Sequence, residues 1–249
     1  MQRAVPLLFV QGPWLRSSVW TTVRALLGQQ GWETRTLDVF DQDGDSAVSS
    51  SLATVRGQVS LLNKSITNSY PPVVVAHSTS CVVAQKYLES FSFSGLILVA
   101  PIPPTPTFDG SIQRLLEVDH ALVRDLSTAS NPPASARHRE LEQLMYGPAA
   151  AMAAAAATDT TDFAAVSQER FLQDVAGTIV NLEPQPVPMQ LICGTEDKVV
   201  TPQCVSSVVL TCHIQSFETA QRARTTCTII RAEHLHSHTY TCAGMCRVS

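Results

Sequence analysis

The sequence is poor in charge: Asp, Glu, Lys and Arg together make up 15% of its 249 residues. Its 17 Lys and Arg residues do not cluster, and with 21 Asp and Glu residues the net charge is −4. Binding to a phosphate backbone requires a concentrated basic surface, so we exclude nucleic acid as a partner. Hydrophobic residues, by contrast, make up 45% of the chain, which is enough for a sizeable core and argues against disorder.

Long apolar runs are missing as well. No stretch approaches the roughly 20 apolar residues that a membrane-spanning helix needs. The amino-terminal segment MQRAVPLLFVQG is not followed by a small-residue cleavage site, so we interpret it as a first core strand rather than a secretory signal. The seven cysteines are odd in number and favour reduced thiols over a disulfide framework. We therefore expect a cytoplasmic protein without a membrane span.

A glycine-rich phosphate-binding turn is also missing. The segment VQGPWLRS, which follows the first predicted strand, contains a single glycine, whereas a dinucleotide-binding turn needs several. No P-loop pattern occurs elsewhere in the chain. These two absences exclude the commonest nucleotide-dependent functions of α/β proteins.

Short apolar segments alternate with helical patterns over the first hundred residues. Segments typical of buried strands occur at residues 5–10, 34–39, 73–76 and 95–100, and again at 189–193 and 226–230. Between them, apolar side chains recur at three- and four-residue intervals, as in the series Val48, Leu52, Val55, Val59 and Leu62. This alternation predicts an α/β fold with a mostly parallel sheet that carries helices on both faces.

The alternation stops between about residues 101 and 175, where only helical patterns occur. We therefore predict a single domain over residues 1–249 with a helical insertion at about 101–175. One predicted helix of the insertion has an apolar face, made of Leu115, Leu116, Leu122, Val123 and Leu126. Such a face suits either a pocket for a hydrophobic substrate or simple packing on the core.

Ser78 stands where a predicted strand meets a predicted helix, in the stretch VVVAHSTSCVVAQKYLES. Open α/β sheets bind ligands at this edge, and the helix amino terminus offers free N–H groups to a developing oxyanion. A tight turn there needs small residues two before and two after the serine, and Ala76 and Ser80 meet that need in place of the usual glycines. Taken alone, Ser78 is equally well explained as a helix N-cap.

Two further strand ends supply the groups that a serine nucleophile requires. Asp197 follows the predicted strand at 189–193 in LICGTEDKVV, and His234 follows the last predicted strand in TCTIIRAEHLHS. A serine hydroxyl needs a histidine base that a carboxylate orients, and this sheet topology presents them in the order Ser, Asp, His. The spacing therefore predicts a triad of Ser78, Asp197 and His234 at one sheet edge.

The chain resembles the α/β-hydrolase superfamily, with LFVQGPW similar to its oxyanion loop and VVVAHSTS to its nucleophile elbow. LICGTEDKVV is similar to its acid loop and IIRAEHLH to its histidine loop, and the helical insertion stands where the family carries a cap. The resemblance implies a serine hydrolase that cleaves an ester or related acyl bond of a small or medium hydrophobic substrate, without cofactor or metal. The backbone N–H groups of Thr79 and Trp14 would then bind the oxyanion.

One departure from the family pattern concerns the oxyanion loop. Its His-Gly pair appears as Gln11-Gly12, and Pro13 occupies the position whose amide usually binds the oxyanion. Proline has no N–H to donate, so Trp14 has to take this role in our interpretation. With Thr79 as the only donor, the rate would fall roughly 10²- to 10³-fold.

Two alternatives compete with the hydrolase hypothesis. The tail HLHSHTYTCAGMC contains His234, His236 and His238 at a period of two, followed by Cys242 and Cys246, and such side chains are able to bind zinc. Its cysteine spacing is not that of a usual zinc knuckle, and we predict no metal. The stronger alternative is a non-catalytic binding or scaffold protein on the same fold, because a fold does not fix a function.

Overall fold

The computed structural model describes residues 5–39, 52–66, 70–104, 110–127, 168–181, 187–194, 199–200, 216–220 and 227–232. Five parallel strands lie side by side: β2 (Thr34–Leu37), β1 (Leu7–Val10), β3 (Val73–His77), β4 (Gly95–Val99) and β5 (Met189–Gly194). Two more strands, β7 (Cys227–Ala232) and β6 (Ser216–Ala220), extend the sheet beyond β5. The described sheet thus has the order β2-β1-β3-β4-β5-β7-β6.

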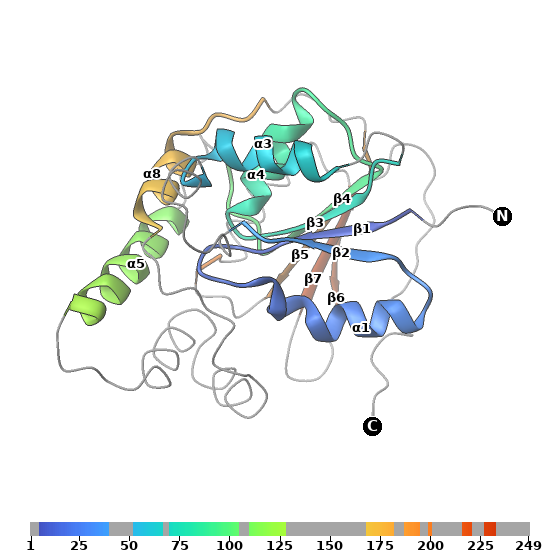
Figure 1. Cartoon of the computed structure of the whole chain (residues 1–249), viewed down its shortest axis with the longest axis horizontal. Coiled ribbons are helices and arrows are strands. Elements are labelled where there is room, and N and C mark those ends of the chain that lie inside the picture. The colour runs from blue at the N-terminus through green and yellow to red at the C-terminus, as the bar shows by residue number, and fades with distance from the viewer. Residues whose placement is uncertain are drawn as a thin grey trace.

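Helices cover both faces of this sheet (Figure 1). Helices α3 (Val55–Ser65) and α4 (Ser80–Leu88) lie on one face, and α1 (Thr21–Gln29), preceded by the 3₁₀ turn η1 (Ser17–Trp20), lies on the other. Helices α5 (Ser111–Ser127) and α8 (Glu169–Gly177) pack against each other beside the end of the sheet where β1 finishes. The predicted fold class, a mostly parallel sheet with helices on both faces, is confirmed.

The core is divided by the two faces of the strands. Alternate strand residues, among them Leu8, Val74 and Leu98, contribute to a large buried cluster that also includes side chains of α3, α4, α5 and α8. The intervening residues Leu7 and Phe9 belong to a smaller cluster on the α1 side. This alternation follows from the period of two along a strand.

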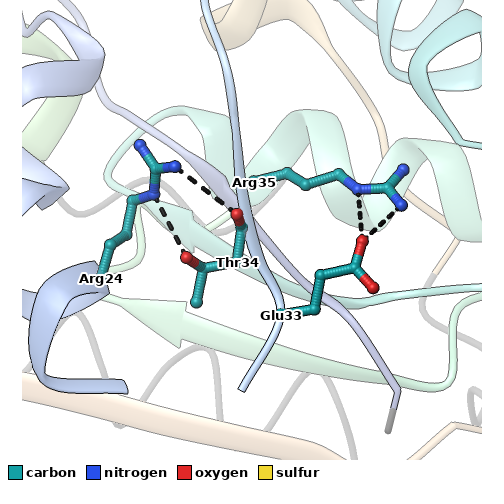
Figure 2. Close-up of polar contacts among 4 residues, drawn as sticks. All are labelled: Arg24, Glu33, Thr34 and Arg35. Carbon is teal, nitrogen blue, oxygen red and sulfur yellow. Dashed lines mark hydrogen bonds and ion pairs between the residues drawn. The ribbon is translucent and has the colours of Figure 1, made fainter. Parts of the chain in front are cut away.

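Helix α1 buries less than its sequence pattern predicts. Val23 and Leu26 lie three residues apart in this helix, as side chains on one apolar face do, yet they are 41% and 51% exposed. The helix is instead held to the edge strand by polar contacts: Arg24 donates to the Thr34 hydroxyl at 3.4 Å and to its carbonyl at 3.5 Å (Figure 2). The ion pair of Arg35 with Glu33 beside it is exposed and adds little to stability.

The last strand runs in the opposite direction to the one predicted. We expected the final strand to be parallel, but β7 is antiparallel to both β5 and β6. The cause is β6, which the sequence analysis missed: an additional strand joined to β7 as an antiparallel neighbour reverses the direction of the chain. Ala232, the last residue of β7, therefore pairs with Met189, the first residue of β5.

Candidate active site

Ser78 lies in a strained turn between β3 and α4. Its φ is +58°, in the left-handed region that non-glycine residues seldom adopt, and the cost of this conformation is about 1–2 kcal/mol. The surrounding backbone compensates, because the Ser78 N–H donates to the Val99 carbonyl at 2.9 Å and its own carbonyl accepts from the Cys81 N–H at 3.1 Å. A strained backbone that its neighbours hold in place is characteristic of functional sites.

The N-cap interpretation of Ser78 does not fit this geometry. The N-cap residue of α4 is Thr79, and its side chain makes no capping hydrogen bond. No described residue forms a hydrogen bond with the Ser78 Oγ either. The hydroxyl of Ser78 is therefore not used to stabilise the start of the helix.

The small residues around the turn have specific contacts. Ala76 and Ser80 are buried, as the predicted tight turn requires. The Ser80 hydroxyl donates to the Gln11 carbonyl at 2.6 Å and so joins the turn to the loop after β1, a bond that glycine could not make. Gly12 of that loop passes so close that a Cβ there would lie 2.7 Å from His77 Nδ1 and 2.9 Å from Ser78 Cβ.

The second predicted oxyanion donor, Trp14, belongs to the loop after β1, which passes beside Ser78. Trp14 is fully buried and has a φ of +61°. Within the described part of the chain, neither the backbone N–H of Trp14 nor that of Thr79 donates a hydrogen bond to another residue. Neither N–H is therefore satisfied by a described residue, whereas Pro13 has no N–H.

A buried carboxylate that the sequence analysis missed anchors this loop. Asp119 of α5 is 0% exposed, and its Oδ1 accepts hydrogen bonds from Trp14 Nε1 at 3.0 Å and from the Gln168 N–H at 2.7 Å. The signal was present in the sequence, because Asp119 interrupts the apolar stripe that Leu115 and Leu122 belong to. A carboxylate in such a stripe needs buried hydrogen-bond donors.

His77, next to Ser78 in the chain, is a half-buried histidine whose ring nitrogen Nδ1 is enclosed. Desolvation by burial lowers its pKa from 6.5 to about 4, so the ring is neutral near pH 7. Its Nδ1 is buried and has no hydrogen-bond partner, and its ring contacts Trp20 edge-on at 6.4 Å between centroids. We assign His77 no proton-transfer role.

Asp197 and His234 lie outside the described residues. The strand that leads to Asp197 has the expected direction, because β5 is parallel to β4 and ends at Gly194 on the same sheet edge as His77 and Val99. The strand before His234 does not have the expected direction. Strand β7 is antiparallel to β5 and ends beside Met189, the first residue of β5, which is at the opposite edge of the sheet from Ser78. The argument that placed His234 at the Ser78 edge by strand direction was therefore wrong, and its assignment rests on the sequence motif alone.

The described residues were compared with what a metal site and a membrane-spanning helix need. No group of three or more His, Cys, Asp or Glu side chains is arranged there to hold a metal ion. The histidines and cysteines of the tail motif lie outside it. Among the described helices, none has the length and apolar character needed to cross a bilayer.

The comparisons with known proteins agree with this architecture. The family model described as "Alpha/beta hydrolase family" matches residues 7–240. No curated protein sequence matches the chain. Similar solved structures include the crystal structure of polyneuridine aldehyde esterase, with a TM-score of 0.57 at 16% identity, covering 84% of this chain and 87% of that one.

Two further solved structures have a similar fold. A structure from a study of carboxylesterases of the thaumarchaeon Nitrososphaera gargenis has a TM-score of 0.58 at 13% identity, covering 85% of this chain and 79% of that one. The thioesterase domain from the curacin biosynthetic pathway has a TM-score of 0.56 at 15% identity, covering 86% of this chain and 83% of that one. At such identities the similarity shows the fold alone.

Proposed function

Because the chain belongs to the alpha/beta hydrolase family, we propose that it is a serine hydrolase that cleaves a carboxylic ester or a related acyl bond. The observation that carries the proposal is the left-handed φ of Ser78 between a parallel strand and its helix. This conformation costs stability and lifts the hydroxyl to the sheet edge where such folds bind ligands. It is the geometry expected of a nucleophile elbow.

The proposed mechanism assigns one role to each residue. Ser78 Oγ attacks the acyl carbonyl while His234 accepts its proton and later returns it to the leaving alcohol. Asp197 orients the imidazole and stabilises its charged form. The N–H groups of Thr79 and Trp14 bind the oxyanion, and this chemistry requires no metal or cofactor.

The proposed substrate class is based on the insertion at about 101–175. Its described helix α5 is amphipathic and lies near the end of the sheet where β1 finishes, and Trp14 of the oxyanion loop contacts it. We propose that this insertion acts as a cap over Ser78 and accommodates a small or medium hydrophobic acyl group. An esterase and a thioesterase are among the solved structures of similar fold.

A second candidate is a non-catalytic binding protein on the same fold. Two observations favour it: Pro13 removes one oxyanion donor, and the direction of β7 gives no support for a histidine beside Ser78. A protein of this kind would bind its ligand at the same sheet edge without forming an acyl-enzyme.

Labelling with a fluorophosphonate probe separates the two candidates. We expect the native chain to be labelled, Ser78→Ala to remain unlabelled, and His234→Ala and Asp197→Asn to react at least about 10³-fold more slowly, as triad variants do. His236→Ala, from the same tail, is the matched control and should react like the native chain. A folded native chain that is not labelled would establish the binding protein, and normal labelling of His234→Ala would show that another group is the base.

A further inference from the structure

The strongest unexplained feature of the described chain is the charge buried in α5. Asp119 has no exposed surface, whereas its neighbours along the same side of the helix, Leu115 and Val118, are apolar and buried. Burial of a carboxylate is unfavourable unless its oxygens accept hydrogen bonds. The hydrogen-bond donors that Asp119 meets in this apolar stripe are therefore what makes its burial possible.

The contacts of Asp119 join three segments that are distant in sequence. Its Oδ1 receives the Trp14 indole N–H from the loop after β1 and the Gln168 backbone N–H, at 3.0 Å and 2.7 Å. Gln168 is the N-cap residue of α8, so the same oxygen also fixes the start of that helix. One atom therefore sets the position of the loop relative to both described helices of the insertion.

Trp14 is the residue of the loop whose position matters most. Pro13 offers no N–H, so the second oxyanion donor has to come from Trp14, whose φ of +61° is unfavourable for a side chain of this size. Anchoring the buried indole at Nε1 holds this backbone in place without any contact to the substrate. Hydrogen bonds to a charged acceptor are stronger than neutral ones, which suits this role.

We propose that Asp119 is a positioning residue for the oxyanion site and acts through Trp14. The inference rests on the proposed function, in which the Trp14 N–H binds the oxyanion. It adds that helix α5 of the insertion contributes to the chemical step by fixing a hydrogen-bond donor of the loop after β1.

The kinetic test compares Asp119→Ala, Trp14→Phe and the double variant with the native chain, in hydrolysis of p-nitrophenyl butyrate. We expect Asp119→Ala to lower kcat roughly 10- to 100-fold with little change in KM, because a misplaced group loses transition-state stabilisation. Trp14→Phe removes the same hydrogen bond, so the double variant should be no slower than the slower single variant. Glu117→Ala removes an exposed carboxylate from the same helix and is the matched control.

A spectroscopic test does not depend on activity. The chain has three tryptophans, so the native protein labelled with ¹⁵N-tryptophan gives three indole signals, and Trp14→Phe identifies the one of interest. We expect Asp119→Ala to shift this signal and to accelerate its exchange with water, while Glu117→Ala leaves it unchanged.

Each outcome decides a different question. A folded Asp119→Ala variant with the native kcat, a change in KM alone, single losses that multiply in the double variant, or an unshifted Trp14 signal would each overturn the positioning role. A native chain that is folded but inert would overturn the proposed function instead. In that case the indole signal would still decide whether Asp119 anchors the loop.

Discussion

Acidification should destabilise this protein through His77. The ring is enclosed between the loop at Gly12 and the indole of Trp20, and burial lowers its pKa from 6.5 to about 4. In the unfolded chain the ring titrates normally, so between these two pH values the unfolded state binds more protons than the folded one. Stability therefore falls as the pH decreases through this window, and His77 has no such effect above pH 6.5.

The size of the effect follows from the same two pKa values. Linkage gives a loss of about 2 kcal/mol between pH 7 and pH 5, rising toward about 3 kcal/mol near pH 4. These are upper values, because part of the residue still reaches the surface even though its Nδ1 is enclosed. A loss of this size is a large fraction of the stability of an ordinary domain.

Urea unfolding, followed by circular dichroism at pH 7, 6 and 5, measures this loss. His77→Gln cannot become charged, so its free energy of unfolding should fall less than that of the native chain by about 1–2 kcal/mol over this range. His120→Gln is the control for the loss of an imidazole as such, since the His120 side chain is 61% exposed. Equal losses in the native chain and in His77→Gln would refute the argument, as would an NMR titration that gives His77 an ordinary pKa.

Two further substitutions test the contact between the loop and the elbow. Gly12→Ala puts a methyl group 2.7 Å from His77 Nδ1 and should cost about 1–3 kcal/mol in urea unfolding and abolish probe labelling. Gly28→Ala has open space around it in helix α1 and should instead stabilise by up to about 1 kcal/mol, so equal effects of the two would contradict the steric argument. Ser80→Ala removes the 2.6 Å hydrogen bond from the Ser80 hydroxyl to the Gln11 carbonyl. Calorimetry should show that the free energy of unfolding falls by about 1–3 kcal/mol. An unchanged Tm would show that this bond is not needed.

The amino-terminal half of the fold was predictable because its signals are local. Strands β1, β3 and β4 are short apolar runs between clear turn residues, and the serine turn follows directly from the strand–helix junction at Ser78. The tolerance for Ser80 in place of glycine was also predictable, since serine is small enough for the tight turn. Its hydrogen bond to Gln11 was not, because it joins residues 69 positions apart.

The carboxyl-terminal part could not be predicted in the same way. The strand β6 has the sequence SFETA, in which alternation is too short to distinguish a strand from a loop. Because β6 was missed, the direction expected for β7 was the reverse of the one observed. The direction of a strand decides which edge of the sheet the next residue reaches, so the expected position of His234 changed with it. The sequence signalled Asp119 as a carboxylate within an apolar stripe, but not its partner, because Trp14 is 105 positions away.

The left-handed backbone of Ser78 has a consequence for how this chain changes over evolutionary time. Glycine adopts this conformation without steric cost. A substitution of Ser78 by glycine therefore relieves backbone strain, which most other substitutions at position 78 do not. In a lineage that no longer needed the hydroxyl, that substitution would be both neutral for function and favourable for stability. Serine is therefore expected to persist at this position only in descendants that still use it, and its loss would mark those that have become binding proteins.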